Sequence, residues 1–255
     1  MKVIILAGGY GTRISEESQY KPKPMIEIGN KPILWHIMNE YSFYGMTEFI
    51  ICAGYKQHVI KEYFYNYSLY NSDVTFDFRD KKGFTVENNH SESWKVTVVD
   101  TGYETNTGKR LKIVQPFVGN ETFMLTYGDG LSDVNIKKLL DFHKAQGKYL
   151  TITATKPESR FGFLELEGNM VKSFREKSQE DVGYINSGYM VMEPQVFDYL
   201  KGNVMLERSP MENLAADGQI VAYRHNGFWQ CMDTMRDKQK LEELWADGNA
   251  PWKVW

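Results

Sequence analysis

The chain opens with Met1-Lys2-Val3-Ile4-Ile5-Leu6-Ala7-Gly8-Gly9-Tyr10-Gly11-Thr12-Arg13, and the predicted fold depends on this stretch. The apolar, β-branched run at residues 3–6 is typical of a strand buried in a parallel sheet. It breaks directly into a glycine loop, whose backbone can take left-handed conformations and approach a ligand closely. Successive N–H groups of such a loop form a nest for an anion. The stretch therefore predicts a strand that leads into a phosphate-binding loop.

Two cationic side chains accompany this loop, Arg13 within it and Lys23 in the following Lys21-Pro22-Lys23-Pro24. They are suited to neutralise a phosphate chain, although a simple tight turn remains an alternative interpretation of the glycines. The dinucleotide-binding fingerprint needs a third glycine where Ile14 stands, which argues against a dehydrogenase. The P-loop pattern also fails, because Gly11-Thr12-Arg13 does not supply Gly-Lys-Ser/Thr.

Composition limits the classes of protein to consider. The chain has 255 residues, a net charge of −3 and no basic block, so we expect no nucleic-acid partner. It has two cysteines, Cys52 and Cys231, without metal-ligand spacing, which favours a reducing compartment and hence the cytoplasm. We expect no signal peptide, because a strand begins at residue 3, and no membrane span, because no apolar run is long enough.

Alternating strands and helices predict the fold class. Apolar runs at 49–53, 96–100, 123–127, 150–155, 189–192 and 220–223 are expected to be strands, and helices are expected at 30–44, 58–65, 110–114, 134–145, 194–200, 210–217 and 235–247. This order predicts an α/β protein with a Rossmann-like, mostly parallel sheet flanked by helices. We expect a single domain over residues 1–255, with a small β-containing insertion at about 66–95 and a C-terminal helical tail at about 235–255.

Two further clusters follow predicted strands, where ligands of such sheets bind. Thr101 to Arg110 combines hydroxyls, glycines and cations, although a solvated loop would have the same composition. Gly128-Asp129-Gly130 exposes a carboxylate with room for a metal ion and a phosphate beside it. A hairpin turn is the alternative there, but the next segment is predicted to be helical.

The pattern Leu-Ala-Gly-Gly-x-Gly-Thr-Arg at residues 6–13, followed by Lys-Pro-Lys-Pro, resembles the signature of the sugar-1-phosphate nucleotidyltransferases. The resemblance implies that Arg13, Lys23 and Asp129 are catalytic. It also implies that Asp129 and Asp233 share one Mg²⁺ ion, although Asp233 could instead cap the helix that follows it. The nucleotide contacts that we expect come from Leu6, Ala7, Gly8, Gly9, Gly11, Thr12, Arg13, Lys23, Thr105, Arg110 and Gly128.

The same resemblance assigns a sugar-phosphate pocket to later segments. A Phe-Gly-x-Leu turn, a Glu-Lys pair and an Asn-x-Gly motif imply contacts from Gly162, Glu176, Lys177 and Asn186, with Lys177 on the phosphate. The sequence departs from the family pattern at Ser178, where proline is usual, and at Lys109, where glycine is more frequent. These departures leave the identity of the phosphate acceptor open.

Several stretches, among them Pro-Ile-Leu-Trp-His-Ile-Met, Tyr-Gly-Asp-Gly and Gly-Phe-Trp-Gln-x-Met-Asp-Thr, are most similar to the branch of that family whose members use CTP and glucose 1-phosphate. This resemblance implies cytidylyl transfer for deoxysugar, O-antigen and lipopolysaccharide synthesis, in a homo-oligomer that we expect to be a hexamer built partly on the insertion. Alternatives are another nucleotide such as dTTP or UTP, another phosphate acceptor, or a nucleotide-binding regulatory protein without catalysis.

Overall fold

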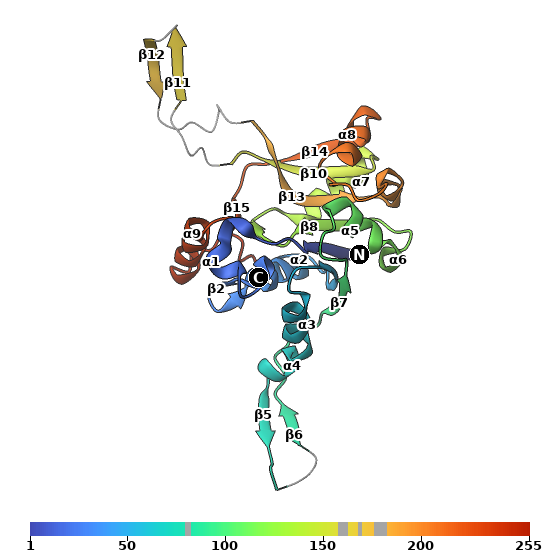
Figure 1. Ribbon diagram of the computed structural model, residues 1–255, viewed down its shortest axis with the longest axis vertical. Helices are drawn as coiled ribbons and strands as arrows, with labels where there is room; N and C mark the ends of the chain where they lie inside the picture. The colour runs from blue at the N-terminus through green and yellow to red at the C-terminus, as the bar shows by residue number, and fades with distance from the viewer. Residues whose placement is uncertain (80–82, 158–162, 168–169, 176–182) are drawn as a thin grey trace.

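A seven-stranded sheet forms the centre of the molecule, in the order β14-β10-β13-β8-β1-β4-β7 (Figure 1). The computed structural model describes residues 1–79, 83–157, 163–167, 170–175 and 183–255. β13 is antiparallel to both of its neighbours, whereas the other pairings in this sheet are parallel. The predicted mostly parallel α/β fold is therefore confirmed. The strands are β1 (Lys2–Ala7), β4 (Glu48–Ala53), β7 (Lys95–Asp100), β8 (Phe123–Tyr127), β10 (Leu150–Thr155), β13 (Ile185–Met192) and β14 (Ile220–His225).

Helices cover both faces of this sheet, so each central strand is buried on both sides. In β1, Val3 and Ile5 belong to one apolar core, and Ile4 and Leu6 belong to the other. This explains the continuous apolar run from which a buried parallel strand was predicted. The α-helices are α1 (Ser15–Ser18), α2 (Ile33–Phe43), α3 (Gln57–Tyr65), α4 (Tyr67–Tyr70), α5 (Thr107–Ile113), α6 (Gln115–Val118), α7 (Ile136–Gln146), α8 (Ser209–Ala216) and α9 (Met235–Ala246).

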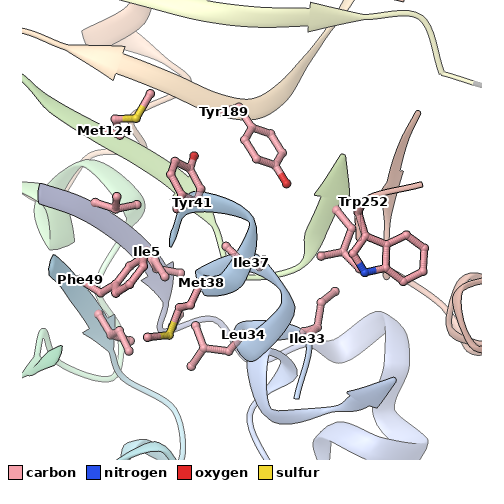
Figure 2. Packing of buried hydrophobic residues seen from close by; sticks show 14 of the residues in the cluster. Ile5, Ile33, Leu34, Ile37, Met38, Tyr41, Phe49, Met124, Tyr189 and Trp252 are labelled. Atoms are coloured by element: carbon pink, nitrogen blue, oxygen red, sulfur yellow. The ribbon is translucent and has the colours of Figure 1, made fainter. Parts of the chain in front are cut away.

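Helix α2 is the main element of the first core. Its residues Leu34, Ile37 and Met38 are fully buried and pack toward Ile5 and Phe49 of the sheet (Figure 2). The second core is closed by α5, α6 and α8 together with the 3₁₀ helix η4 (Pro194–Tyr199). The two cores hold the carboxyl ends of β1, β4, β7 and β8 at one edge of the sheet, where the glycine loop begins.

Four short antiparallel pairs complete the described structure: β2 (Glu27–Ile28) with β3 (Lys31–Pro32), β5 (Asp73–Phe76) with β6 (Phe84–Glu87), β9 (Gly130–Ser132) with β15 (Trp229–Cys231), and β11 (Phe163–Glu167) with β12 (Met170–Arg175). The β5–β6 pair extends beyond α3 and α4 at one end of the molecule, and the β11–β12 pair lies at the other end (Figure 1). The first of these pairs falls within the predicted insertion, although the assignment of residues 1–255 to a single domain stays a prediction.

Most element boundaries differ from the prediction by one or two residues, but some differ more, and β13 begins at Ile185 rather than at the predicted residue 189. The helix expected from residue 30 begins at Ile33, because Lys31 and Pro32 pair with β2. The helix expected at 110–114 begins three residues earlier, at Thr107. The segment predicted as a helix at 194–200 is the 3₁₀ helix η4. Within the described residues, none of the helices is long and apolar enough to span a bilayer.

The imidazole of His36 is fully buried between α2 and the C-terminal residues. Its Nε2–H donates to the carbonyl of Ile28 at 2.8 Å, and its Nδ1 accepts from Trp252 Nε1 at 3.3 Å, which defines a neutral tautomer. Burial lowers the pKa of His36 from its ordinary 6.5 to about 4. The folded protein therefore binds fewer protons than the unfolded chain between these two pH values.

This buried histidine makes stability depend on pH. Because the unfolded chain binds the extra proton, the contribution of neutral His36 to the free energy of unfolding is fully present above pH 6.5. This contribution is lost as the pH falls toward 4. We expect the free energy of unfolding to fall by about 2 kcal/mol between pH 7 and pH 5 from this group. Urea unfolding of the wild type and of His36→Gln, which stays neutral and can still donate to Ile28, measures the difference. Equal losses in the two proteins would contradict the prediction.

Candidate active site

The glycine loop after β1 is fitted closely around one buried side chain. A Cβ atom on Gly8 would lie 2.2 Å from Nη1 of Arg110, so only glycine leaves room there. Gly11 has φ +66°, in the left-handed region, and starts the 3₁₀ helix η1 (Thr12–Ile14). These two positions explain why the loop needs its glycines, and they bring its backbone to the edge of the sheet above Arg110.

Arg110, which was predicted to bind the nucleotide, directs its guanidinium to the protein backbone. Its Nη2 donates to Gly8 O at 3.0 Å, and its Nη1 donates to Gly102 O at 2.8 Å and to Thr101 Oγ1 at 2.7 Å. Burial lowers its pKa from the ordinary value, but an arginine of this kind stays charged. Arg110 thus ties together the loops that follow β1 and β7, and it forms the floor of a cleft.

The cleft has a volume of about 600 Å³ and lies over the carboxyl ends of β1 and β8. The structure brings together in it every residue predicted to contact the nucleotide, and both predicted metal ligands. These residues are Leu6, Ala7, Gly8, Gly9, Gly11, Thr12, Arg13, Lys23, Thr105, Arg110, Gly128, Asp129 and Asp233.

At one end of the cleft, Lys23 joins the two predicted metal ligands. Its Nζ lies 2.6 Å from Asp129 Oδ2 and 2.5 Å from Asp233 Oδ1. Arg13 Nη1 lies 2.6 Å from the other oxygen of Asp233, on the exposed side. Lys23 belongs to the 3₁₀ helix η2 (Lys23–Met25), Asp129 follows β8 and Asp233 precedes α9. Three segments far apart in the sequence therefore build one charged centre.

The protonation of this centre follows from its contacts. Burial acts to lower the pKa of Lys23, but Asp129 and Asp233 outweigh it, and the net pKa lies above the ordinary value. Burial likewise acts to raise the pKa of Asp233, but its bonds from Lys23 and the charge of Arg13 leave it below the ordinary value. Lys23 is cationic and Asp233 is anionic at neutral pH.

The carboxylates of Asp129 and Asp233 fit a magnesium site. Both already face one cation, the Lys23 ammonium, so the donors converge on a shared point of positive charge. Magnesium is usually held by one or two carboxylates, and phosphate oxygens and waters complete its coordination. Within the described residues there is no cluster of three or more acidic, histidine or cysteine ligands. A nucleotide would therefore have to supply further ligands to an ion at this place.

The alternative role of Asp233, as the N-cap of α9, falls to another residue. Thr234 is the N-cap, and its hydroxyl accepts from the backbone N–H of Asp237 in a capping box. The Asp233 carboxylate is therefore free to face Lys23 and Arg13.

Another part of the cleft, here called its aromatic end, is lined by tyrosine side chains near Arg110 and Glu104. Tyr10 and Tyr103 line the cleft with ring centroids 5.0 Å apart, and Tyr55 packs behind both of them. These tyrosines form no recognisable sequence pattern, because they are scattered over three loops. A planar apolar group fits such a wall better than a phosphate does. Other lining residues that were not among the predicted contacts are Pro24, Glu104, Asn106, Tyr127 and Met205, whereas Thr107 is one of the hydroxyls of the predicted cluster at 101–110.

Neither cysteine is suited to act as a nucleophile. Burial raises the pKa of the Cys52 thiol to about 12, and burial together with Asp233 and Asp129 raises that of Cys231 to about 12. Both are therefore thiols at neutral pH rather than reactive thiolates. Both are free.

The predicted sugar-phosphate residues lie mostly outside the described part of the chain. Gly162, Glu176 and Lys177 belong to the undescribed segments, and so does the departure at Ser178. Asn186 is described at the start of β13, where its Oδ1 accepts from the backbone N–H of Gly188 at 2.9 Å. It does not line the cleft described above.

Comparisons with known proteins identify the family to which this chain is similar. Residues 2–238 match the family model described as nucleotidyl transferase. The chain is 52% identical over the whole length of both chains to a glucose-1-phosphate cytidylyltransferase of Salmonella typhi, and 44% identical, again over both full lengths, to a probable glucose-1-phosphate cytidylyltransferase of Bacillus subtilis.

Solved structures show the same fold at low sequence identity. One is a putative glucose-1-phosphate thymidylyltransferase from Bacillus anthracis, with a TM-score of 0.67 and 20% identity over 96% of this chain and 94% of that chain. Another is a UDP-glucose pyrophosphorylase from Acinetobacter baumanii, with a TM-score of 0.69 and 15% identity over 94% of this chain and 91% of that chain.

Proposed function

The chain belongs to the nucleotidyl transferase family, and from this premise we propose that it transfers the cytidylyl group of CTP to glucose 1-phosphate, giving CDP-glucose and pyrophosphate. The observation that carries the proposal is the 52% identity over full length to a relative named for this activity. The cleft supports it, because its charged end suits a triphosphate and its aromatic end suits a base.

The reaction needs positioning and charge neutralisation rather than a protein nucleophile. A phosphate oxygen of glucose 1-phosphate attacks the α-phosphorus of CTP, the new P–O bond forms, and the bond to the bridging oxygen of the β-phosphate breaks. Backbone N–H groups of the loop at residues 8–11 would hold the phosphates. Arg13 and Lys23 would offset the charge that develops on the α-phosphorus and on the departing pyrophosphate.

Asp129 and Asp233 would hold the magnesium ion that we propose as the cofactor. When bound there, the ion supplies further neutralisation of phosphate charge. The two carboxylates would fix its place, and Lys23 would remain beside them as a cation that accompanies the phosphates. The acceptor-side roles of Gly162, Glu176, Lys177 and Asn186 stay predictions.

We place the base of the nucleotide at the tyrosine end of the cleft. The charged centre would hold the phosphates, so the remaining part of the nucleotide extends toward Tyr10, Tyr103 and Thr105. The product would feed deoxysugar synthesis for surface polysaccharides, and the two free cysteines support the reducing cytoplasm as the compartment.

A pyrophosphate-release assay tests the proposed function. CTP, UTP, dTTP, ATP and GTP are each combined with glucose 1-phosphate, mannose 1-phosphate or galactose 1-phosphate in the presence of Mg²⁺. We expect the highest kcat/KM for CTP with glucose 1-phosphate. A clear preference for another pair would reassign the substrates within the family, and release with none of the pairs would favour a regulatory nucleotide-binding protein.

We also propose that the protein is a homo-oligomer, with a hexamer as the expected form, and that a second copy of the chain covers the β5–β6 pair. This pair exposes Phe76 and Phe84, and Phe78, which follows β5, is exposed beside them. The ring centroid of Phe76 lies 6.3 Å from that of Phe78 and 5.8 Å from that of Phe84, and within the described residues none of the three belongs to either apolar core. An isolated two-stranded pair is only marginally stable in water, so a partner surface would stabilise it.

A charge on this surface is expected to disrupt the assembly. Phe78 is 94% exposed, so Phe78→Glu leaves the fold intact but places a carboxylate in the proposed interface. We expect a smaller molar mass by size-exclusion chromatography with light scattering. Phe117→Glu, at a 45% exposed phenylalanine of α6, is the matched control. Loss of assembly in both variants, or in neither, would argue against the β5–β6 pair as the interface.

A further inference from the structure

A buried carboxyl group outside the charged centre has no role in the reaction proposed above. Glu40 of α2 is fully buried, and its Oε1 has no hydrogen-bond partner. Its Oε2 lies 2.8 Å from the hydroxyl of Tyr189. The ionisable groups that face it are Tyr41, Tyr44, Tyr189 and Asp133, each of which is neutral or anionic. Within the described residues, Glu40 forms no ion pair with a lysine, arginine or histidine.

The hydroxyl of Tyr189 has a second close neighbour. It lies 3.1 Å from the carbonyl oxygen of Gly130, the residue after Asp129. Tyr189 is itself fully buried, and its ring stacks on Tyr41 with centroids 5.9 Å apart (Figure 2). The ring therefore holds its hydroxyl between α2 and the first residue of β9.

Counting protons determines the direction of these bonds. A tyrosine hydroxyl has one proton, whereas the carbonyl of Gly130 and an ionised Glu40 would both be acceptors. Both contacts are hydrogen bonds if Glu40 carries a proton. Glu40 then donates to the Tyr189 oxygen, and Tyr189 donates to Gly130. With an ionised Glu40, either the carbonyl or a buried carboxylate would lack a donor, which is costly in an apolar interior.

We infer that Glu40 is a positioning residue, which as a neutral carboxylic acid orients Tyr189 so that Tyr189 holds the carbonyl of Gly130 and fixes the Gly130–Leu131 peptide, one residue beyond Asp129. The neighbouring carbonyl, that of Asp129, accepts from the backbone N–H of Met232 at 2.8 Å. The two successive peptide groups after Asp129, those of Asp129–Gly130 and Gly130–Leu131, are thus anchored from two elements. The inference rests on the proposed function, in which Asp129 is a metal ligand.

The environment of Glu40 agrees with the neutral form. Burial raises the pKa of Glu40 well above its ordinary value, and the charge of Asp133 adds to the effect, whereas the bond with Tyr189 acts in the other direction. The Oδ1 atom of Asp133 lies 2.9 Å from His225 Nε2 but makes no hydrogen bond within the described residues.

Two variants of Glu40 separate positioning from packing. Glu40→Gln keeps a donor for Tyr189 without a charge, and Glu40→Leu keeps an apolar volume without the donor. We expect Glu40→Gln to stay within about twofold of the wild type, and Glu40→Leu to lose about five- to tenfold in kcat, as expected for one lost hydrogen bond. The Mg²⁺ concentration for half-maximal activity is expected to rise in Glu40→Leu and not in Glu40→Gln.

Stability gives the contrasting readout. Replacing a buried polar group with an apolar one of similar size is often neutral or stabilising, so the melting temperature of Glu40→Leu is expected to stay the same or rise. A variant that is equally stable but needs more Mg²⁺ supports positioning. Unchanged kcat and Mg²⁺ dependence in Glu40→Leu would reduce Glu40 to a packing residue and overturn the inference.

Infrared difference spectroscopy tests the protonation state without any turnover. We expect the wild type at neutral pH to show the carbonyl stretch of a protonated carboxylic acid, and Glu40→Gln to lack it. The absence of this band in the wild type would overturn the inference. Because this measurement and Mg²⁺ binding by calorimetry need no substrate, they remain decisive even if the pyrophosphate-release assay refutes the proposed function.

Discussion

Lys23→Met is expected to lower kcat by about a hundredfold to a thousandfold, the range measured when one preorganised electrostatic group is removed from an active site. The ammonium of Lys23 is the cation that lies closest to both Asp129 and Asp233 in the cleft, at 2.6 and 2.5 Å. In the proposed reaction it faces the phosphates at the point where charge builds up. Methionine keeps the length and much of the volume of the side chain but removes the charge, so the loss measures electrostatics rather than packing.

The same substitution is expected to change the response to magnesium. Without the ammonium, two carboxylates face each other with less compensation, and Asp233 loses the bond that lowers its pKa. We therefore expect Mg²⁺ to raise the melting temperature of Lys23→Met more than that of the wild type. A protein that binds the metal better and yet turns over more slowly would separate the role of Lys23 in catalysis from the formation of the site.

Lys21→Met provides the matched control. Lys21 is two residues away in the same Lys-Pro-Lys-Pro stretch, but its ammonium pairs with Glu27 at 2.9 Å, outside the cleft. Kinetics of both variants under saturating CTP and glucose 1-phosphate measure the difference. Near-normal turnover of Lys23→Met, or an equal loss in Lys21→Met, would remove Lys23 from the proposed mechanism.

Much of the cleft could be predicted because its parts are local in sequence. The glycine loop follows β1 directly, and Gly128-Asp129-Gly130 follows β8, so the rule that ligands bind at the carboxyl ends of parallel strands placed both at one edge. The contacts of Arg110 could not be predicted in this way. Apart from the Thr101 hydroxyl, its partners include backbone oxygens of Gly8, Gly102 and Tyr103, and backbone atoms leave no mark in a sequence pattern.

Other features depend on tertiary pairing. The reversal of β13 within the sheet could not be inferred from its apolar run, because a buried strand has the same composition in either direction. The choice between N-cap and ligand for Asp233 depended on Thr234 and Asp237 forming the capping box. Glu40 stands within an apolar helical stripe, and its meeting with Tyr189, almost 150 positions later, exists only in the folded chain.

Asp233→Asn is expected to lower kcat by about a hundredfold or more, comparable to the loss of other charge-stabilising groups in active sites, and to raise the Mg²⁺ requirement. Asparagine keeps the shape of the side chain but has no charge for the ion. Lys23 would still be paired with Asp129, whereas Arg13 would lose its partner, since its Nη1 contacts Asp233 at 2.6 Å. Chelation of Mg²⁺ with EDTA should abolish the activity of the wild type, and added Mg²⁺ should restore it.

A Mg²⁺ titration distinguishes metal binding from simple electrostatics. If Asp233 holds the ion, activity in Asp233→Asn should recover in part at high Mg²⁺ concentration, because Asp129 and the phosphates remain as ligands. If Asp233 acts chiefly by holding Lys23 and Arg13 in place, extra metal should not help. Asp217→Asn is the matched control, because this aspartate accepts from Tyr199 at 2.8 Å away from the cleft.

The Mg²⁺ titration also tests why Asp129 and Asp233 both face the ammonium of Lys23. A pair of aspartates held together without a cation would repel each other in the empty enzyme, and Lys23 offsets that repulsion until metal and nucleotide arrive. The ammonium then has to share its partners with the ion, which frees it to contact phosphate. This competition requires a definite order of Mg²⁺ affinity. Lys23→Met should bind Mg²⁺ most tightly, the wild type less tightly, and Asp233→Asn least tightly.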